Sequence, residues 1–347
     1  KREARRMDIH CHFALAAAQQ AVDQAGLKEG NFDPYRTGVI YGSGVGGLHI
    51  AEQEIPKLNE KGPGRVSPLC IPEMIANMAA AYISMRFGFK GENFCPVSAC
   101  ATGNHAIGEA MRAIRHGYQD VVICGGTENG IIPISMAGFQ NMKAVHTGDD
   151  PTCASIPFDA RRSGFVMGEG AGCLVLESLS HAEARGATIL AELAGYGASG
   201  DAYHITSPSP DGEAAARAIL NAITDAGLTP ADVDNINAHG TSTPLNEKYE
   251  TIAIKKAFGD EAYNVKVSST KSMTGHLLGG AAAVEAIACV MAVREGIVPP
   301  TIGYQEPDLE CDLDITPNKA VEMPVNVAIS NSLGFGGHNA CILIKKV

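Results

Sequence analysis

Apolar residues along this chain alternate between two patterns, one typical of helices and one typical of buried strands. Helical spacing covers residues 9–25, which end at Gly26, a common helix C-cap, and it appears again over residues 71–85. Short continuous apolar runs at residues 38–41, 120–128 and 173–177 predict strands that are covered on both faces. This alternation of strand and helix predicts an α/β layered fold.

A second series of the same kind begins near residue 189, without a long linker or a low-complexity segment before it. The predicted strands of this series lie at residues 190–196, 233–239, 265–269, 326–331 and 340–344. Its predicted helices lie at residues 212–226 and 277–293. The chain is therefore predicted to consist of two similar halves, residues 1–188 and 189–347.

Cys100 lies where a short apolar run ends and a helical pattern begins, with Ile107, Ala110 and Met111 at helical spacing behind it. Unpaired N–H groups and the positive end of the helix dipole meet at such a junction. We therefore expect the junction to favour the thiolate, with a pKa moved from about 8.5 toward roughly 3.5–7.5. A lone cysteine is more often structural, so this interpretation needs reacting partners elsewhere.

Three predicted strand ends in the second half carry polar or distinctive residues: His239, then Lys271 with His276, then Phe335 in a glycine turn. The carboxyl ends of strands in α/β sheets converge on one crevice. Two histidines and a lysine near an elbow cysteine indicate nucleophilic catalysis assisted by polarising donors. No carboxylate lies beside either histidine in sequence, which argues against a hydrolase triad.

Composition narrows the choice of partners and compartment. The chain has 27 basic and 38 acidic residues, a net charge of −11, which argues against nucleic acid as a partner. Its first six residues reverse this balance with four basic side chains. Ten cysteines without zinc-ligand spacing predict no metal site and fit a reducing cytoplasm.

Two further stretches could be mistaken for a nucleotide-binding loop and for a membrane-spanning helix. The glycine-rich turn at residues 42–47 superficially resembles a phosphate cradle, but it lacks the Lys-Ser/Thr pair of a P-loop. We expect it to line a pocket instead. The longest apolar stretch, residues 277–293, contains Glu285 and is rich in glycine and alanine, which predicts a core helix and not a membrane span.

Four ordered blocks match a known family: residues 97–100 (Val-Ser-Ala-Cys), 239–244 (His-Gly-Thr-Ser-Thr-Pro), 271–276 (Lys-Ser-Met-Thr-Gly-His) and 334–337 (Gly-Phe-Gly-Gly). Together they resemble the β-ketoacyl-acyl-carrier-protein synthases, most of all the elongating, synthase II type of bacterial type II fatty-acid synthesis. The resemblance implies a thiolase-type αβαβα fold with mixed sheets and buried helices. It places the nucleophilic cysteine in the first half and the catalytic histidines in the second.

The resemblance also implies a reaction. Cys100 would take an acyl group from acyl-carrier protein as a thioester, and malonyl-carrier protein would then lose CO₂ while His239 and His276 stabilise the enolate. The resulting carbanion would attack the acyl group and give a 3-oxoacyl product two carbons longer. Backbone N–H groups of Cys100 and Phe335 would form the oxyanion hole, and the Phe335 side chain would gate the acyl pocket.

Other positions acquire roles only through this resemblance. Lys271 would organise the site and pair with Glu250, while Thr241 and Thr243 would bind the phosphopantetheine arm. That arm arrives on the carrier protein, so no cofactor is expected. The residues implied to line the acyl pocket are Val45, Phe139 and Phe165, with Val45 at the interface of a homodimer. The residues implied to receive the acidic carrier protein are Arg2, Arg5, Arg6, Lys143 and Arg65.

The chain departs from the family in three places. Relatives begin with a further strand ahead of Lys1, so a core strand is expected to be missing from this sequence. His338 takes a position that is often threonine, and Glu247 one that is often aspartate.

Several related proteins are alternatives. A degradative thiolase needs a second cysteine in the final glycine block, an initiating synthase uses Cys–His–Asn, and a non-catalytic partner subunit loses the elbow cysteine. Each is disfavoured by the residues present. A ketosynthase of polyketide assembly shares the chemistry and stays open.

Overall fold

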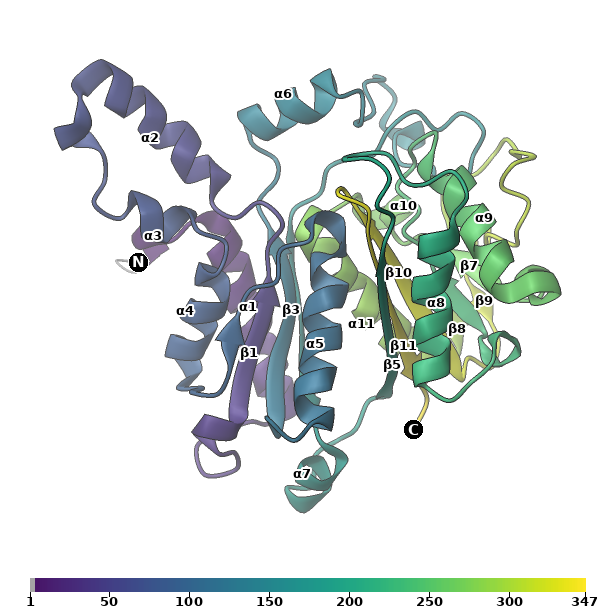
Figure 1. Cartoon of the computed structure of the whole chain (residues 1–347), viewed down its shortest axis with the longest axis horizontal. Helices are drawn as coiled ribbons and strands as arrows, with labels where there is room; N and C mark the ends of the chain where they lie inside the picture. Colours follow the sequence, from purple (N-terminus) through teal and green to yellow (C-terminus); the bar gives the residue numbers. More distant parts are fainter. Residues whose placement is uncertain (1–3) are drawn as a thin grey trace.

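The computed structural model describes residues 4–347 and contains two main β-sheets (Figure 1). The first has the order β2-β1-β3-β4, in which β1, β2 and β3 run parallel and β4 is antiparallel to β3. The second has the order β5-β11-β10-β6-β7, with β10, β6 and β7 parallel and β11 antiparallel to both of its neighbours. A small ladder pairs β8 with β9.

The strands of the first sheet are β1 (Thr37–Gly42), β2 (Asn93–Phe94), β3 (Val121–Glu128) and β4 (Gly170–Glu177). Those of the second are β5 (Glu192–Gly200), β6 (Asn235–Asn237), β7 (Lys266–Ser268), β10 (Val327–Gly334) and β11 (His338–Lys345). The small ladder consists of β8 (Ile297–Val298) and β9 (Val321–Glu322). All strands of the first sheet therefore precede residue 189 in the sequence, and all strands of the second sheet follow it.

Helices form three layers around these sheets (Figure 1). Helices α1 (Ile9–Ala25) and α4 (Met78–Phe87) cover the outer face of the first sheet. Helices α5 (Thr102–Arg115) and α11 (Ala281–Glu295) pack between the sheets, and α8 (Glu213–Asp225) with α9 (Asn246–Phe258) covers the second sheet. The predicted αβαβα layering is confirmed.

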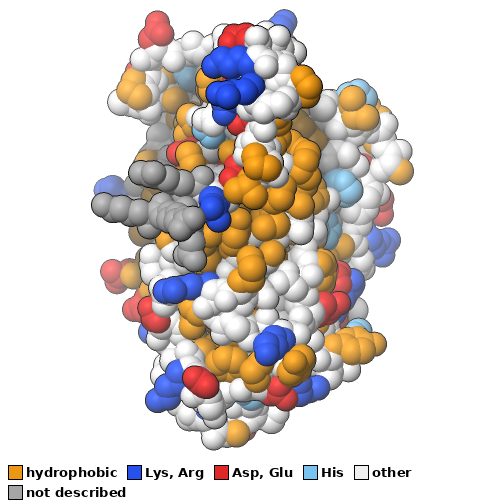
Figure 2. Space-filling view, turned by 90° about the vertical axis from the view of Figure 1, so that its left-hand side faces the viewer, with side chains coloured by type: hydrophobic (Ala, Val, Ile, Leu, Met, Phe, Trp, Pro, Cys, Tyr) orange, Lys and Arg blue, Asp and Glu red, His pale blue; other side chains and the backbone are white. Residues whose placement is uncertain are grey.

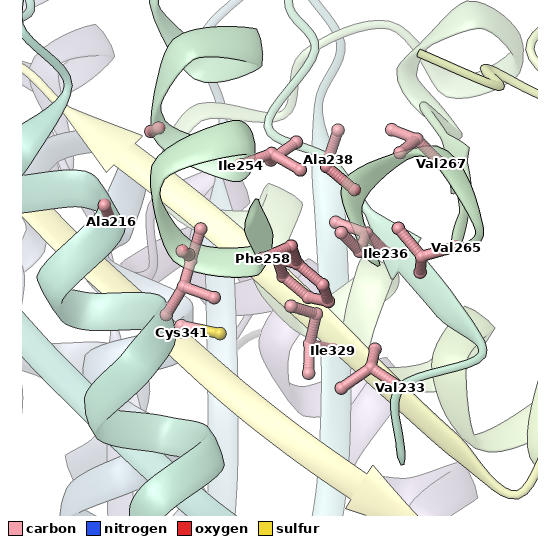
Figure 3. Packing of buried hydrophobic residues seen from close by; sticks show 14 of the residues in the cluster. Ala216, Val233, Ile236, Ala238, Ile254, Phe258, Val265, Val267, Ile329 and Cys341 are labelled. Carbon is pink, nitrogen blue, oxygen red and sulfur yellow. The ribbon is translucent and has the colours of Figure 1, made fainter. Parts of the chain in front are cut away.

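The outer core of the second half is built from aliphatic and aromatic side chains (Figure 3). Phe258 at the end of α9 packs with Ile236 and Ile329, which lie opposite each other on the paired strands β6 and β10. The middle layer has smaller side chains, because α11 buries Ala282, Ala286 and other alanines against both sheets. Within residues 4–347, no helix has the combination of length and apolar character needed to cross a bilayer.

Some helix predictions were wrong in extent. Residues 71–85 form two helices, α3 (Cys70–Met74) and α4, because Ile75 adopts an extended backbone with ψ of 138°. The apolar spacing misled here, since Ile71 is 59 % exposed and does not belong to the core. The predicted helix at residues 277–293 begins later, at Ala281, after a turn of 3₁₀ helix.

Five helices were not predicted: α2 (Leu48–Lys61), α6 (Pro133–Asn141), α7 (Leu179–Ala184), α9 and α10 (Lys271–Thr274). Helix α2 buries only Glu54, and its apolar side chains Ile55 and Leu58 are exposed in the single chain. It extends away from the body of the molecule (Figure 1). The short helix α10 follows β7 and carries one of the predicted site residues.

Candidate active site

Cys100 lies on a strained turn that joins the first sheet to the buried helix α5. Ala99 has a φ of +50°, which non-glycine residues rarely adopt. The turn Ala99–Ala101 is 3₁₀ helix and α5 begins at Thr102, whose Oγ1 accepts a hydrogen bond from Ser98 N at 2.9 Å. Cys100 therefore lies just before α5, the helix that packs between the two sheets. Only 9 % of the Cys100 surface is exposed.

The other predicted site residues come from neighbouring parallel strands of the second sheet. Since β10, β6 and β7 are adjacent and parallel, their carboxyl ends meet at one edge. One nitrogen of His239, one nitrogen of His276 and the Cys100 sulfur all lie within 4.8 Å of one another. The two imidazole rings are 5.3 Å apart between centroids and nearly perpendicular, at 87°. The predicted convergence of strand ends is confirmed.

The glycine turn after β10 packs directly on the cysteine elbow. A Cβ atom added to Gly334 would lie 2.6 Å from Ser98 O and 3.3 Å from Cys100 N, so only glycine permits this approach. Burial raises the pKa of the Cys100 thiol, and the backbone N–H of Phe335, which faces the sulfur, offsets a small part of that rise. The backbone N–H groups of Cys100 and Phe335 are thereby brought together, as an oxyanion hole requires.

Burial dominates the electrostatics of the three reacting side chains. It raises the pKa of Cys100 to about 12, against the opposing effects of the Lys271 charge and the Phe335 N–H. The prediction of a lowered thiol pKa at the helix start was therefore wrong, because burial disfavours the charged thiolate. Burial, together with the Lys271 charge, holds the pKa values of His239 and His276 well below the usual range. The site rests as a neutral thiol between neutral imidazoles.

Lys271 forms its buried ion pair with Glu285 of α11, and the predicted pairing with Glu250 was wrong. Glu250 accepts hydrogen bonds from the backbone N–H groups of His239, at 2.7 Å, and Gly240, at 2.8 Å. Glu250 thus fixes the backbone that carries one catalytic histidine. The sequence did contain a signal for Glu285, since a carboxylate inside an apolar helix needs a partner.

Among the described residues, neither histidine has a hydrogen-bonded carboxylate that would orient it as a base. Both Nδ1 atoms are buried and find no hydrogen-bond partner among residues 4–347. Cys100, His239 and His276 also have the donor types and spacing of a candidate metal-ion group. The exposed His338 does not belong to this group.

Aromatic and aliphatic side chains surround the cysteine. Phe165 is buried and packs edge-to-face on His276 at 5.3 Å and on Phe139 at 5.3 Å. Phe139 lies 6.4 Å from Phe335, so the turn and the aromatic pair form one wall. The same cluster contains apolar residues that sequence reasoning missed: Val145, Met167 and Leu278. Their apolar character alone does not distinguish them from ordinary core residues.

Thr241 and Thr243 lie together in the loop after His239, with their hydroxyl oxygens 3.0 Å apart. Arg162 holds this loop by donating to the carbonyl oxygens of Thr243 and Pro244, each at 3.0 Å. Glu247 lies 3.3 Å from Arg162 and accepts a hydrogen bond from the Ser242 backbone. Arg162 was not predicted, since nothing in sequence separates it from its neighbour Arg161.

The remaining predicted positions are peripheral. Val45 is 43 % exposed in the single chain. Arg6, Arg65 and Lys143 are exposed, as residues that meet a charged partner must be. Arg2 and the side chain of Arg5 lie outside the described residues.

Known proteins share both this sequence and this fold. Residues 1–182 match the family profile "Beta-ketoacyl synthase, N-terminal domain", and residues 190–305 match "Beta-ketoacyl synthase, C-terminal domain". The chain is 54 % identical to a Synechocystis "3-oxoacyl-[acyl-carrier-protein] synthase 2" over all of the chain and 83 % of that protein. It is 51 % identical to the Staphylococcus aureus protein of the same name, over 84 % of that protein.

Several solved structures have the same fold as this chain. A "Beta-ketoacyl synthase from Burkholderia phymatum" superposes with a TM-score of 0.93 at 33 % identity, covering all of this chain and 84 % of that one. A type II polyketide ketosynthase in complex with its acyl-carrier protein gives a TM-score of 0.95 at 36 % identity, over 97 % of this chain and 85 % of that one. The chain belongs to the β-ketoacyl synthase family.

Proposed function

We propose that this protein is a 3-oxoacyl-acyl-carrier-protein synthase that elongates fatty acyl chains by two carbons through decarboxylative condensation. The observation that carries the proposal is the buried centre in which Cys100, His239 and His276 meet under the Phe335 turn. The names of relatives that are more than 50 % identical over the whole chain support the same reaction.

In the first step, the Cys100 sulfur attacks the thioester carbonyl of an acyl-carrier protein. The thiol proton moves to a neutral imidazole nitrogen, and the carbonyl oxygen takes up negative charge between the N–H groups of Cys100 and Phe335. A donor of this kind is typically worth about 2.7–4 kcal/mol when it is removed. Collapse of the intermediate expels the carrier thiolate, which takes up the proton, and leaves an acyl-Cys100 thioester.

In the second step, the malonyl group loses CO₂ and the electron pair of the broken C–C bond enters an enolate. His239 and His276 are neutral and can each donate an N–H to the enolate oxygen. The enolate carbon then attacks acyl-Cys100, and the cysteine leaves as a thiolate near Lys271. The product is a 3-oxoacyl chain on the carrier protein, and the cysteine regains a proton before the next cycle.

The reaction needs no cofactor held by this chain, since the phosphopantetheine arm comes with its carrier protein. We place that arm beside the hydroxyl groups of Thr241 and Thr243. The carrier protein is acidic, and we propose that it docks on the basic group Arg2, Arg5, Arg6, Arg65 and Lys143. Such contacts weaken with added salt.

We further propose that two copies of this chain form a homodimer in the cytoplasm. Apolar side chains gather on the face drawn in Figure 2, over the region of α2, α3 and α4. Exposed apolar residues on or next to these helices are Ile55, Leu58, Ile71, Ile75 and Met85. An apolar area of this kind fits an obligate interface better than open solvent.

A polyketide-type ketosynthase is the second candidate, because one structural neighbour is described as a ketosynthase "bound to the hexaketide". The two are separated by supplying acyl-carrier protein and malonyl-carrier protein and analysing the product by mass. The fatty-acid proposal predicts one condensation per acyl donor and a 3-oxoacyl product longer by two carbons. Repeated condensation without reduction would favour the polyketide alternative, and no condensation would refute both.

A further inference from the structure

The cysteine elbow is tied to the middle of α5 by a side-chain hydrogen bond that takes no part in the proton transfers. Ser98, two residues before Cys100, has its hydroxyl oxygen 2.6 Å from Nδ1 of His105. The Ser98 N–H donates to Thr102 Oγ1 at 2.9 Å, and the Ser98 carbonyl oxygen accepts from Ala101 N at 3.1 Å. All three polar groups of Ser98 are therefore bound to the segment that starts the helix.

The elbow needs such support, because its backbone is strained next to Ser98. Ala99 has a φ of +50°, and a residue with a side chain keeps this conformation only where its surroundings enforce it. Ser98 also sets the position of the Phe335 turn, since a Cβ on Gly334 would come within 2.6 Å of the Ser98 carbonyl oxygen. A shift of Ser98 would therefore move the elbow and the Phe335 N–H relative to each other.

His105 is itself held against the second half of the chain. Its ring packs edge-to-face on Tyr196 of β5, at 6.3 Å between centroids, and on His338 of β11, at 6.4 Å. His338 begins β11, three residues after Phe335. Burial, and then the neighbouring His338, lower the pKa of His105 to about 4, so the imidazole is neutral near pH 7. His105 thus contacts the elbow on one side and the strand that follows the Phe335 turn on the other.

We propose that His105 is a positioning residue of the acylation step, which holds Ser98 so that the N–H groups of Cys100 and Phe335 converge on one carbonyl oxygen. The inference rests on the proposed function, because that oxygen belongs to the thioester that acylates Cys100. In this role His105 acts through Ser98 and transfers no proton to or from the substrate. Its effect belongs to the transition state, in which the oxyanion forms, and not to binding of the donor.

Two substitutions remove the hydrogen bond from opposite sides. His105→Phe keeps an aromatic ring for the contacts with Tyr196 and His338, but it leaves the Ser98 hydroxyl without its partner. Ser98→Ala removes the hydroxyl and leaves the imidazole in place. A neutral hydrogen bond corresponds to about 2- to 12-fold in an equilibrium constant, and a buried group left without its partner to more. Since both variants break the same bond, the double variant should be no slower than the slower single variant.

The experiment compares two reactions of Cys100 in each variant: acylation by an acyl-carrier protein, followed by intact mass, and alkylation by iodoacetamide. Acylation passes through an oxyanion, whereas alkylation forms none. Each single variant should lower the maximal acylation rate about tenfold, and leave both the half-saturating donor concentration and the alkylation rate within twofold. Equal losses in the two reactions, a loss confined to the half-saturating concentration, or normal acylation would each overturn the inference.

His181→Phe is the matched control, because His181 also bonds a side chain through Nδ1, 2.7 Å from Glu177 Oε1, at the opposite end of the first sheet (Figure 1). It should be acylated at the normal rate. If the unsubstituted protein acquires no acyl group from its carrier protein, the proposed function fails and the inference fails with it. If that protein is acylated and the variants match it, the inference alone fails. Ser98→Ala, the smaller change, supplies the test if His105→Phe does not fold.

Discussion

The approach of the Phe335 turn to the cysteine elbow provides a sharp test, through the substitution Gly334→Ala. The added methyl would lie 2.6 Å from Ser98 O, a backbone atom that cannot rotate away. The turn must then move off the elbow, and the Phe335 N–H moves with it. Loss of one oxyanion-hole donor costs about 2.7–4 kcal/mol, which corresponds to a factor of about 10²–10³ in rate.

The assay for this variant is the rate at which Cys100 is acylated by acyl-carrier protein. We expect Gly334→Ala to lose about two to three powers of ten in that rate. Gly138→Ala is the matched control, because a Cβ at Gly138 on α6 meets no neighbour within 4 Å. It should acylate at the normal rate. Acylation of Gly334→Ala at the normal rate would refute the assignment of the Phe335 N–H to the oxyanion hole.

Three further predictions follow from the site. His276→Ala should abolish malonyl decarboxylation and leave acylation of Cys100 largely intact, as judged by CO₂ release and by intact mass; the opposite result contradicts the assigned roles. Burial raises the pKa of Cys100 to about 12, so its alkylation by iodoacetamide should still rise about tenfold per pH unit at pH 9, and a plateau below pH 8 would disprove this. Glu285→Gln leaves Lys271 as an unpaired buried charge, which should destabilise the fold by about 3–5 kcal/mol in denaturant unfolding, and an unchanged midpoint would argue against the ion pair.

The sequence was sufficient for the layered fold and for the reacting side chains. His239, His276 and Phe335 follow predicted strands, and parallel neighbouring strands bring their ends together whatever the details of the loops. Cys100 was found by a different signal, because the spacing of apolar residues changes from that of a strand to that of a helix at this position.

The partners of the buried charged side chains could not be predicted from the sequence. Lys271 pairs with Glu285 and not with Glu250, because that choice depends on how α11 packs between the sheets. The raised pKa of Cys100 likewise depends on the depth of burial and not on its place before a helix. Arg162 acts through backbone groups far away in sequence, and no local pattern records those contacts.

The most direct test of the central claim follows the acyl group on Cys100 through one turnover. The protein is loaded with an isotopically labelled acyl group from its carrier protein, separated from free donor, and then mixed with malonyl-carrier protein. We predict a labelled adduct on Cys100 that disappears at the rate at which labelled 3-oxoacyl-carrier protein and CO₂ appear, and no adduct or product with Cys100→Ala. Formation of the 3-oxoacyl product by Cys100→Ala, or a Cys100 adduct that malonyl-carrier protein does not discharge, would contradict the account.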